Sequence, residues 1–496
     1  MAKRWQYLAG AALVAMASPV VAQDAATTAR IEAMQAQIDA LQKQLEELKT
    51  LTAAQASASP ATPPVATAAA PPAPAPKPAT PPVQVAWKGA PEFTAEGGWR
   101  FKPRGRMQFD AASVGNPNGN IPTANLGFNS RSRRILFGFE GDVPGGIKWR
   151  AEFDFAQGGV GYEDVMFQYA PKGSPVSAQF GYFYPFQGLE TMSSSGATTF
   201  IERAQMTDAF VHSRRIGAAV GYVQGDLRFN AGLFNDSINA NFDNDDWMFG
   251  SRLVWSPEAL GGRIHLGATY QHREFQSNAL NFQYRARPFV QTTDVRFTDT
   301  GLVAARGDDI YGIEAAGIFG PLHVASEAQW VKTDTIANPA TLTGIESVAG
   351  GTAFAGNADF FSWYAEAGWW LTGETRGYRD GSWQRTSVKK GFDKGGWGAV
   401  GVNLRYDYLD LRDRVATGTP ATSFAAPNFV NGGTQTGYLA SLIWQPIDYV
   451  RFMAQYTRAE IEGGPRAAVV VPGSTAPIPD RDYGVDIFAV RAQFEF

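Results

Sequence analysis

The chain lacks cysteine, and among its 496 residues it has only four histidines. The absence of cysteine excludes a disulfide framework and thiolate metal sites. The histidines are dispersed without the spacing of metal ligands, at His212, His265, His272 and His323, so no metal site is expected. No nucleophile and base stand in a recognisable motif, and no glycine-rich loop carries the lysine of a phosphate cradle. We therefore expect neither a cofactor nor enzyme activity.

Long apolar runs are also missing beyond the N-terminus. A helix that crosses a bilayer needs about 20 such residues, so the mature chain is expected to lack one. Charged residues make up 18% of the chain, and the formal net charge is −4. Because basic residues do not outnumber acidic ones, the composition does not indicate nucleic-acid binding. Any attraction for anions must come from the local placement of charges.

The first 96 residues are expected to form three segments that precede the main domain. Lys3 and Arg4 stand before an apolar stretch and a small-residue cleavage site, so residues 1–22 are typical of a secretory signal peptide. Residues 23–51 carry a heptad pattern of apolar side chains. Residues 52–96 are rich in alanine, proline and threonine, a composition that cannot bury a core and favours an extended linker.

The heptad pattern predicts a short α-helical coiled coil. Apolar side chains recur at alternating spacings of three and four residues, with Ile31, Ile38 and Leu45 at position a and Met34, Leu41 and Leu48 at position d. A helix of this length is about 30 Å long and is marginal alone, so we expect it to associate with the same helix of other copies. The alternative is an amphipathic helix that packs on its own domain.

From Gly97 the pattern changes to strict alternation. In residues 99–109 the odd positions are apolar, aromatic or small, and the even positions are arginine, lysine or glutamine. In residues 147–155 apolar side chains alternate with charged ones. A strand places such sets on opposite faces. A soluble sandwich alternates too, but these segments approach ten residues and carry aromatic side chains at their ends, as bilayer-spanning strands do.

The connections between these segments predict a closed transmembrane β-barrel. Short turns such as 142–146 alternate with long connections such as 187–213 and 274–308, as in outer-membrane barrels with short periplasmic turns. We expect an all-β, antiparallel barrel of about sixteen strands over residues 97–496. The segment Thr372–Gly396 stands where a short turn is due, so it is either a real excursion or a slip in the assigned register.

Six stretches form the most specific pattern of the chain. They are SRSRRILFGFEGD (130–142), IKWRAEFDFA (147–156), the run 181–203 that ends in TFIER, WYAEAGWWLTGETRGY (363–378), GAVGVNLRYDYLDLRD (398–413) and the terminal FAVRAQFEF. Together they resemble the phosphate-selective porin O/P family. The resemblance implies a trimer of sixteen-stranded barrels, each constricted by an inward-folded third outer loop, in which anions pass along basic side chains. Where that family commonly has a lysine, this chain has Tyr184.

Basic side chains gather in the first strands of the predicted barrel. The candidate anion path consists of Arg100, Lys102, Arg104, Arg106, Arg131, Arg133, Arg134, Lys148, Arg150 and Arg203. Guanidinium groups bind phosphate oxygens in a bidentate manner, and a row of them lets an anion move from one to the next. The alternative is that these side chains pair with Glu140, Glu152 and Asp154 across strands and stiffen the wall.

The stretch Gln179–Phe210 is expected to narrow the pore. A connection of this length between strands is usually functional or disordered, and this one is rich in hydroxyl groups and poor in charge. Its candidate constriction residues are Tyr184, Ser193, Ser194, Ser195, Thr199 and Glu202. The hydroxyl groups could donate to a phosphate or form bonds within the loop, and Arg203 could instead anchor the loop to the wall.

Together these features predict a porin of the bacterial outer membrane, with its N-terminal segment in the periplasm, that passes small anions such as phosphate or oligophosphate. Its expected partners are the permeant anions, outer-membrane lipid and the other copies of a homotrimer. One alternative is a general or sugar-permeable porin, which Tyr184 and the acidic net charge favour. Another is a structural tether, in which the coiled coil contacts the cell wall and the barrel serves as its anchor.

Overall fold

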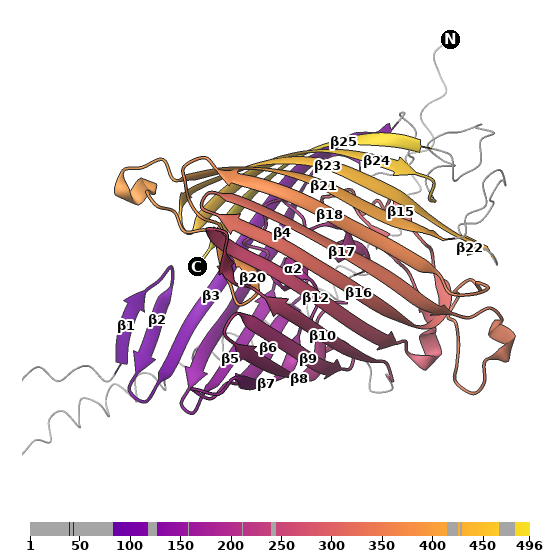
Figure 1. Ribbon diagram of the computed structural model, residues 1–496, viewed down its shortest axis with the longest axis horizontal. Coiled ribbons are helices and arrows are strands. Elements are labelled where there is room, and N and C mark those ends of the chain that lie inside the picture. Colours follow the sequence, from indigo (N-terminus) through magenta and orange to yellow (C-terminus); the bar gives the residue numbers. More distant parts are fainter. Residues whose placement is uncertain are drawn as a thin grey trace, which may run out of the picture. The chain divides into compact units, whose positions relative to one another are not determined.

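The alternating segments form sixteen antiparallel strands that close into a barrel (Figure 1). Their bounds are β3 (Trp99–Val114), β4 (Gly127–Val143), β5 (Ile147–Asp154), β6 (Gly161–Tyr169), β7 (Val176–Phe183), β8 (Arg215–Gln224), β9 (Leu227–Phe234), β10 (Trp247–Trp255), β12 (Gly262–Glu274), β16 (Val303–Phe319), β17 (Leu322–Thr335), β18 (Asp359–Trp370), β21 (Ala399–Asp413), β23 (Phe429–Ile447), β24 (Val450–Glu462) and β25 (Asp482–Glu495). The last strand pairs with the first, with Phe494 opposite Met107. This closure confirms the predicted all-β barrel.

The computed structural model describes only part of the chain, which divides into the units Met1–Ala79 and Thr80–Phe496. In the second unit, which contains the barrel, it describes residues 83–117, 126–156, 158–210, 212–239, 245–413, 425–426, 429–465 and 482–496. In the first it describes Asp39 and Lys43, both helical. The predicted signal peptide, the rest of the predicted coiled coil and the linker up to residue 82 lie outside the described residues.

The end of the predicted linker is a β-hairpin rather than a spacer. Strands β1 (Val83–Trp87) and β2 (Pro91–Ala95) pair with each other, and β2 pairs with β3 through Phe93 opposite Phe101. The linker assignment of residues 83–96 is therefore wrong. The proline-rich composition of the preceding stretch hid the alternating VQVAW pattern, whose valine and tryptophan side chains suit a strand.

The remaining elements are short and lie in the connections. They are α2 (Leu189–Met192), β11 (Glu258–Ala259), α3 (Gln205–Ala209), η2 (Ser277–Ala279), β13 (Asn281–Phe282), β14 (Arg285–Ala286), β15 (Thr298–Asp299), η3 (Pro339–Thr341), β19 (Gly377–Arg379), β20 (Ser382–Gln384), η4 (Phe392–Lys394) and β22 (Ala425–Ala426). No helix in the described part of the chain has the length and apolar character needed to cross a bilayer.

The two faces of each barrel strand differ as the pleat requires. On the outer face of β24, Phe452 and Tyr456 are 41% and 39% exposed. On the lumen side of the same strand, Arg451 and Gln455 are buried. A barrel in a membrane places its apolar set toward lipid and its polar set toward the lumen, and the same alternation recurs along β21 and β25.

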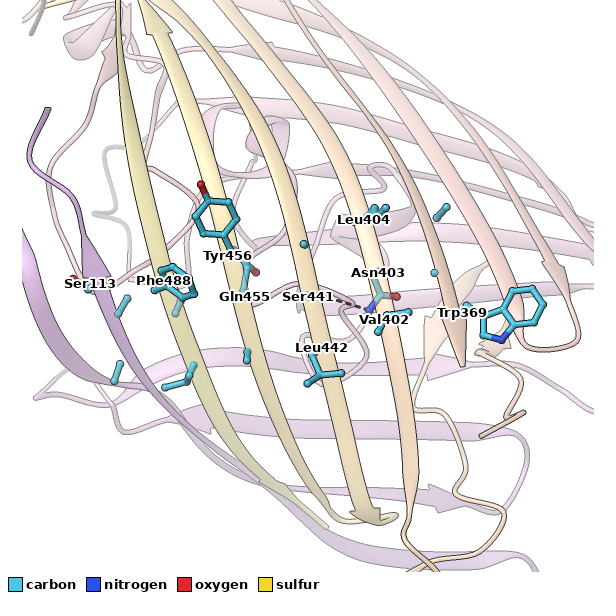
Figure 2. A pocket seen from close by; sticks show the side chains of 18 of the residues that line it. Ser113, Trp369, Val402, Asn403, Leu404, Ser441, Leu442, Gln455, Tyr456 and Phe488 are labelled. Atoms are coloured by element: carbon cyan, nitrogen blue, oxygen red, sulfur yellow. Dashed lines mark hydrogen bonds between the residues drawn. The ribbon is translucent and has the colours of Figure 1, made fainter. Parts of the chain in front are cut away.

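A shallow apolar groove of about 720 Å³ crosses the outer face over β18, β21, β23, β24, β25 and β3 (Figure 2). Its lining includes Ala367, Ala440 and Ala454, together with the larger side chains of Trp369 and Phe488. Small side chains between aromatic ones leave room for flexible apolar groups. This surface therefore fits the acyl chains of a membrane.

Three connections fold inward and fill much of the lumen. They are residues 184–214 with α2 and α3, residues 275–302 with β13 to β15, and residues 371–388 with β19 and β20. Buried side chains from all three, among them Phe210, Tyr284 and Trp383, belong to one hydrophobic cluster with the barrel wall. The long connection at Thr372–Gly396 is accordingly a real excursion and not a slip in the assigned register.

We expect Gly437→Ala on β23 to displace the second inward segment. A Cβ atom at this position would lie 2.1 Å from Cζ of Phe289, so the ring and its segment must shift, at a cost of about 1–3 kcal/mol. Thermal unfolding should begin at a lower temperature, and single-channel conductance should rise. The control is Gly250→Ala on β10, whose Cβ would meet its nearest neighbour at 3.5 Å. Equal behaviour of the two variants would contradict this packing.

Candidate functional site

Residues 184–210 and 212–214, here called the constriction loop, fold into the lumen with α2 and α3. Its two helices are too short to satisfy their own backbone groups, and buried backbone groups need partners. The barrel wall supplies them. Ser441 donates to the carbonyl of Thr199 at 2.6 Å, and Arg451 donates to the carbonyl of Gly196 at 2.8 Å. These bonds fix the loop against β23 and β24.

Arg405 on β21 is the centre of a buried ionic cluster that holds the constriction loop. Its guanidinium donates to Glu190 in α2 and, at 2.5 Å, to Glu366 on β18. Arg376 from the third inward segment donates to the same Glu366 at 2.6 Å. The Phe200 ring covers Arg405, with 4.5 Å between the ring centroid and Cζ. Because these charges are buried, removal of one leaves its partners uncompensated.

The inward hairpin β19–β20 supports the constriction loop from the end of the barrel that carries the short turns. The backbone N–H of Trp383 donates to Ser193 Oγ at 2.8 Å, and the guanidinium of Arg376 lies 3.7 Å from the Trp383 ring centroid. Arg252 on β10 donates to the carbonyl of Gly381 at 2.8 Å. The hairpin is thereby tied to both the wall and the loop.

A cavity of about 180 Å³ remains between the constriction loop, β4 and the second inward segment. This constriction cavity is lined by Arg133, Arg134, Tyr184, Thr191, Glu202, Arg203, Gln205, Thr207, Asp208, Arg287, Phe289, Val290 and Gln291. It brings together five residues that the sequence singled out, namely Arg133, Arg134, Tyr184, Glu202 and Arg203. We take it as the candidate site.

A β-bulge on β4 explains why two successive arginines reach this cavity. Ser132 pairs with Phe109 and Arg134 pairs with Gln108, so Arg133 is an extra residue on its strand. Strict alternation would place Arg133 and Arg134 on opposite faces. A bulge re-aims side chains locally, and here both side chains line the cavity.

Glu202 of the constriction loop forms ion pairs with two arginines of the barrel wall. Arg133 approaches its carboxylate at 2.7 Å, and Arg491 on β25 approaches it at 2.9 Å. Burial raises the pKa of Glu202, but the two guanidinium groups outweigh burial and hold this pKa well below its ordinary value. Through its contacts with both arginines, Glu202 anchors the loop to β4 and β25.

Arg134 and Arg203 line the same cavity as Glu202 and Asp208 but donate to uncharged acceptors. Among the described residues neither forms an ion pair. Arg134 donates to Gln108 Oε1 at 3.0 Å, and Arg203 donates to the carbonyls of Glu190 and Ser193 at 2.8 and 2.6 Å. A guanidinium has five N–H donors, so these bonds leave donors for a bound anion.

Three other predicted path residues share one carboxylate in the wall. Arg100, Arg104 and Arg150 approach Glu140 at 2.7, 2.9 and 3.4 Å. Arg104 also approaches Glu152 at 2.9 Å. This is the arrangement of cross-strand ion pairs that stiffen a sheet, and it lies outside the constriction cavity.

Arg106 and the hydroxyl groups of the constriction loop are occupied with each other and with the wall. Arg106 donates to Ser194 Oγ and Ser195 Oγ at 2.7 Å each and to a carboxylate of β25 at 2.8 Å. Ser193 and Thr199 donate to a loop carbonyl and to a wall carboxylate at 2.6 and 3.0 Å. These groups hold the loop in its fold.

The last three predicted path residues do not line the constriction cavity. Lys102 is half-buried on β3, and Lys148 is exposed on β5. Arg131 donates to the carbonyl of Gln291 at 2.8 Å, so it touches the second inward segment at the rim of the constriction cavity.

Three arginines of the late strands were missed by the sequence analysis, namely Arg405, Arg451 and Arg491. Each is the one basic residue on the lumen side of its strand, beside outward-facing apolar neighbours such as Leu404, Phe452 and Val490. That placement is the signal that could have found them. Their partners on the constriction loop are more than two hundred residues away along the chain and carry no periodic pattern.

The fold is that of a porin, a channel-forming barrel of the outer membrane. It has sixteen strands in a closed barrel, an apolar outer face and a lumen narrowed by inward segments. The chain belongs to the phosphate-selective porin O and P family, whose model matches residues 101–496. The family and the barrel fold together indicate a channel protein.

Two relatives and two solved structures illustrate the similarity. An uncharacterized protein of Caulobacter vibrioides is 34% identical over 465 residues, covering 90% of this chain and 85% of that protein. Porin O of Pseudomonas aeruginosa is 23% identical over 412 residues, covering 77% and 87%. The anion-selective porin from Comamonas acidovorans aligns with a TM-score of 0.47 at 10% identity, covering 80% of this chain and 100% of that one. The channel DcaP of Acinetobacter baumannii gives 0.46 at 11% identity, covering 82% and 99%.

We expect Arg405→Ala to loosen the constriction loop, since it leaves Glu190 and Glu366 buried without this partner. Loss of one member of a buried ion pair costs about 3–5 kcal/mol, so the purified barrel should unfold at a lower denaturant concentration. The control is Arg458→Ala on β24, whose ion pair with Asp486 is exposed and contributes about 0–1 kcal/mol. Equal losses in the two variants would contradict the anchoring role of Arg405.

Proposed function

We propose that this porin conducts small anions, phosphate or oligophosphate among them, through the constriction cavity. The observation that carries the proposal is the position of Arg134 and Arg203 beside Arg133, where the first two have no carboxylate partner among the described residues. A pore selects by charge and hydrogen-bond donors at its narrowest point. Guanidinium groups offer both in the geometry that phosphate oxygens accept.

A permeant ion must also leave, so its binding has to be weak. Two acids line the same cavity and limit its positive charge. Glu202 pairs with Arg133, and Asp208 accepts from Arg287 at 3.5 Å. The lining therefore carries a small net positive charge, because the two acids offset part of the charge of the arginines. Such a charge attracts an anion but binds it weakly enough for release.

A general or sugar-permeable porin is the second candidate function. It is favoured by the pairing of Arg100, Arg104 and Arg150 with Glu140, which removes three cations from the proposed path. It is also favoured by Tyr184, which lines the cavity and carries no charge to attract phosphate. In this case the arginines would serve the wall alone.

We also propose that the short-turn end faces the periplasm and that three copies associate. The end of β25 lies at this end of the barrel (Figure 1), and short turns face the periplasm in outer-membrane barrels. Trimerisation is supported by membership of the porin O and P family and by the heptads predicted upstream, which suit self-association. A tether to the cell wall through those heptads is the alternative.

Phosphate should block chloride current through single channels in a planar bilayer. In Arg134→Gln the block should need about tenfold more phosphate, because a hydrogen bond to a charged group contributes about 1.5–3 kcal/mol. The control is Arg100→Gln, which removes a cation that is paired in the wall and should leave the block unchanged. If phosphate has no effect and cations pass as readily as anions, the general-porin candidate is correct.

Deletion of residues 23–82 should separate the channel from the tether. A channel should keep its single-channel conductance, while its trimers should dissociate at a lower temperature because the self-associating helices are gone. Native gel electrophoresis across a temperature series measures the second effect. Unchanged trimer stability would refute a role for the heptads in assembly. Leakage of periplasmic proteins from cells with normal conductance would instead support the tether.

A further inference from the structure

The loop Lys389–Gly398, which continues from the inward hairpin toward β21, is a closed structure at the short-turn end. It is the orange loop with η4 near the marked C-terminus in Figure 1. Gly398 N–H donates to the carbonyl of Lys390 at 3.0 Å, and Gly396 N–H donates to the carbonyl of Gly391 at 2.9 Å. These bonds give the loop a fixed shape, here called the rim platform.

The rim platform rests on aromatic side chains of the outer barrel face. Phe392 packs edge-on against Trp444 with 5.6 Å between ring centroids, and Trp444 stacks on Phe452 at 5.4 Å. Trp444 Nε1 donates to the carbonyl of Trp397 at 2.9 Å. Phe392 and Trp397 are themselves 52% and 83% exposed. Aromatic residues in this position lie at the headgroup level of a membrane.

Positive charge surrounds these exposed aromatic rings. The platform carries three lysines and one acid, so it has a surplus of two positive charges. Lys389 donates to the carbonyl of Gly373. Lys390 and Lys394 are exposed, and their ammonium groups form no hydrogen bond or ion pair with the described residues. The acid, Asp393, is exposed as well.

We propose that the rim platform binds the headgroup of an anionic phospholipid in the inner leaflet of the outer membrane. Clusters of basic residues at the membrane surface attract anionic headgroups, and Lys390 and Lys394 supply donors for the phosphate oxygens. Phe392 and Trp397 have the apolar bodies that settle at the boundary between headgroups and acyl chains. The choice of leaflet rests on the proposed orientation of the barrel, whereas headgroup binding itself is independent of conduction.

Native mass spectrometry of the full-length protein tests this proposal. Phosphatidylglycerol and phosphatidylcholine with identical acyl chains are titrated separately. The wild-type protein should bind phosphatidylglycerol more tightly. The double variant Lys390→Gln with Lys394→Gln should bind it about tenfold or more weakly, because each lysine near a membrane surface contributes roughly fivefold. Binding of phosphatidylcholine should not change.

The control is Lys172→Gln, which alters a lone exposed lysine in a turn at the same end of the barrel and should leave both affinities unchanged. Equal binding of the two lipids by the wild type, unchanged binding by the double variant, or an equal loss in Lys172→Gln would each overturn the proposal. Single-channel conductance of the double variant should match the wild type, so failure of lipid binding and failure of the proposed channel function are distinguishable.

Discussion

Charge buried inside a barrel has to be paired, and this constraint governs the lumen. Arg405 stands between Glu190 of the constriction loop and Glu366 of the wall, and Arg376 of the inward hairpin shares the second carboxylate. All four groups are buried, so each depends on the others. The loop, the hairpin and two wall strands are thereby joined by one set of interactions. These anchored segments determine which part of the lumen stays open.

The arginines of the early strands divide into two groups once these contacts are known. Those near the short-turn end neutralise carboxylates within the wall, as Arg100 and Arg150 do with Glu140. Those at the constriction form fewer ion pairs, and Arg134 forms none with the described residues. A pore lined throughout by unpaired cations would hold anions too firmly. A cavity in which two acids lie beside the arginines is compatible with selection and with rapid release.

Much of the barrel could be predicted from the sequence, because a strand with one apolar and one polar face has alternating apolar and polar residues. This alternation did not predict the parts of the chain that are not regular barrel strands. The bulge at Arg133 re-aims a side chain without altering the composition. The VQVAW hairpin strand was hidden beside a proline-rich stretch. The cavity residues Arg287 and Asp208 come from loops without any period, so only the folded chain brings them together.

The anchors of the constriction loop have a consequence for biosynthesis. Glu190 precedes Arg405 by 215 residues, and Gly196 precedes Arg451 by 255. Synthesis and export proceed from the N-terminus, so the loop enters the periplasm long before the strands that will hold it. The partners of Glu190 and Gly196 are absent until those strands arrive. The constriction, although encoded in the first half of the chain, therefore gains these contacts only when the last strands are in place.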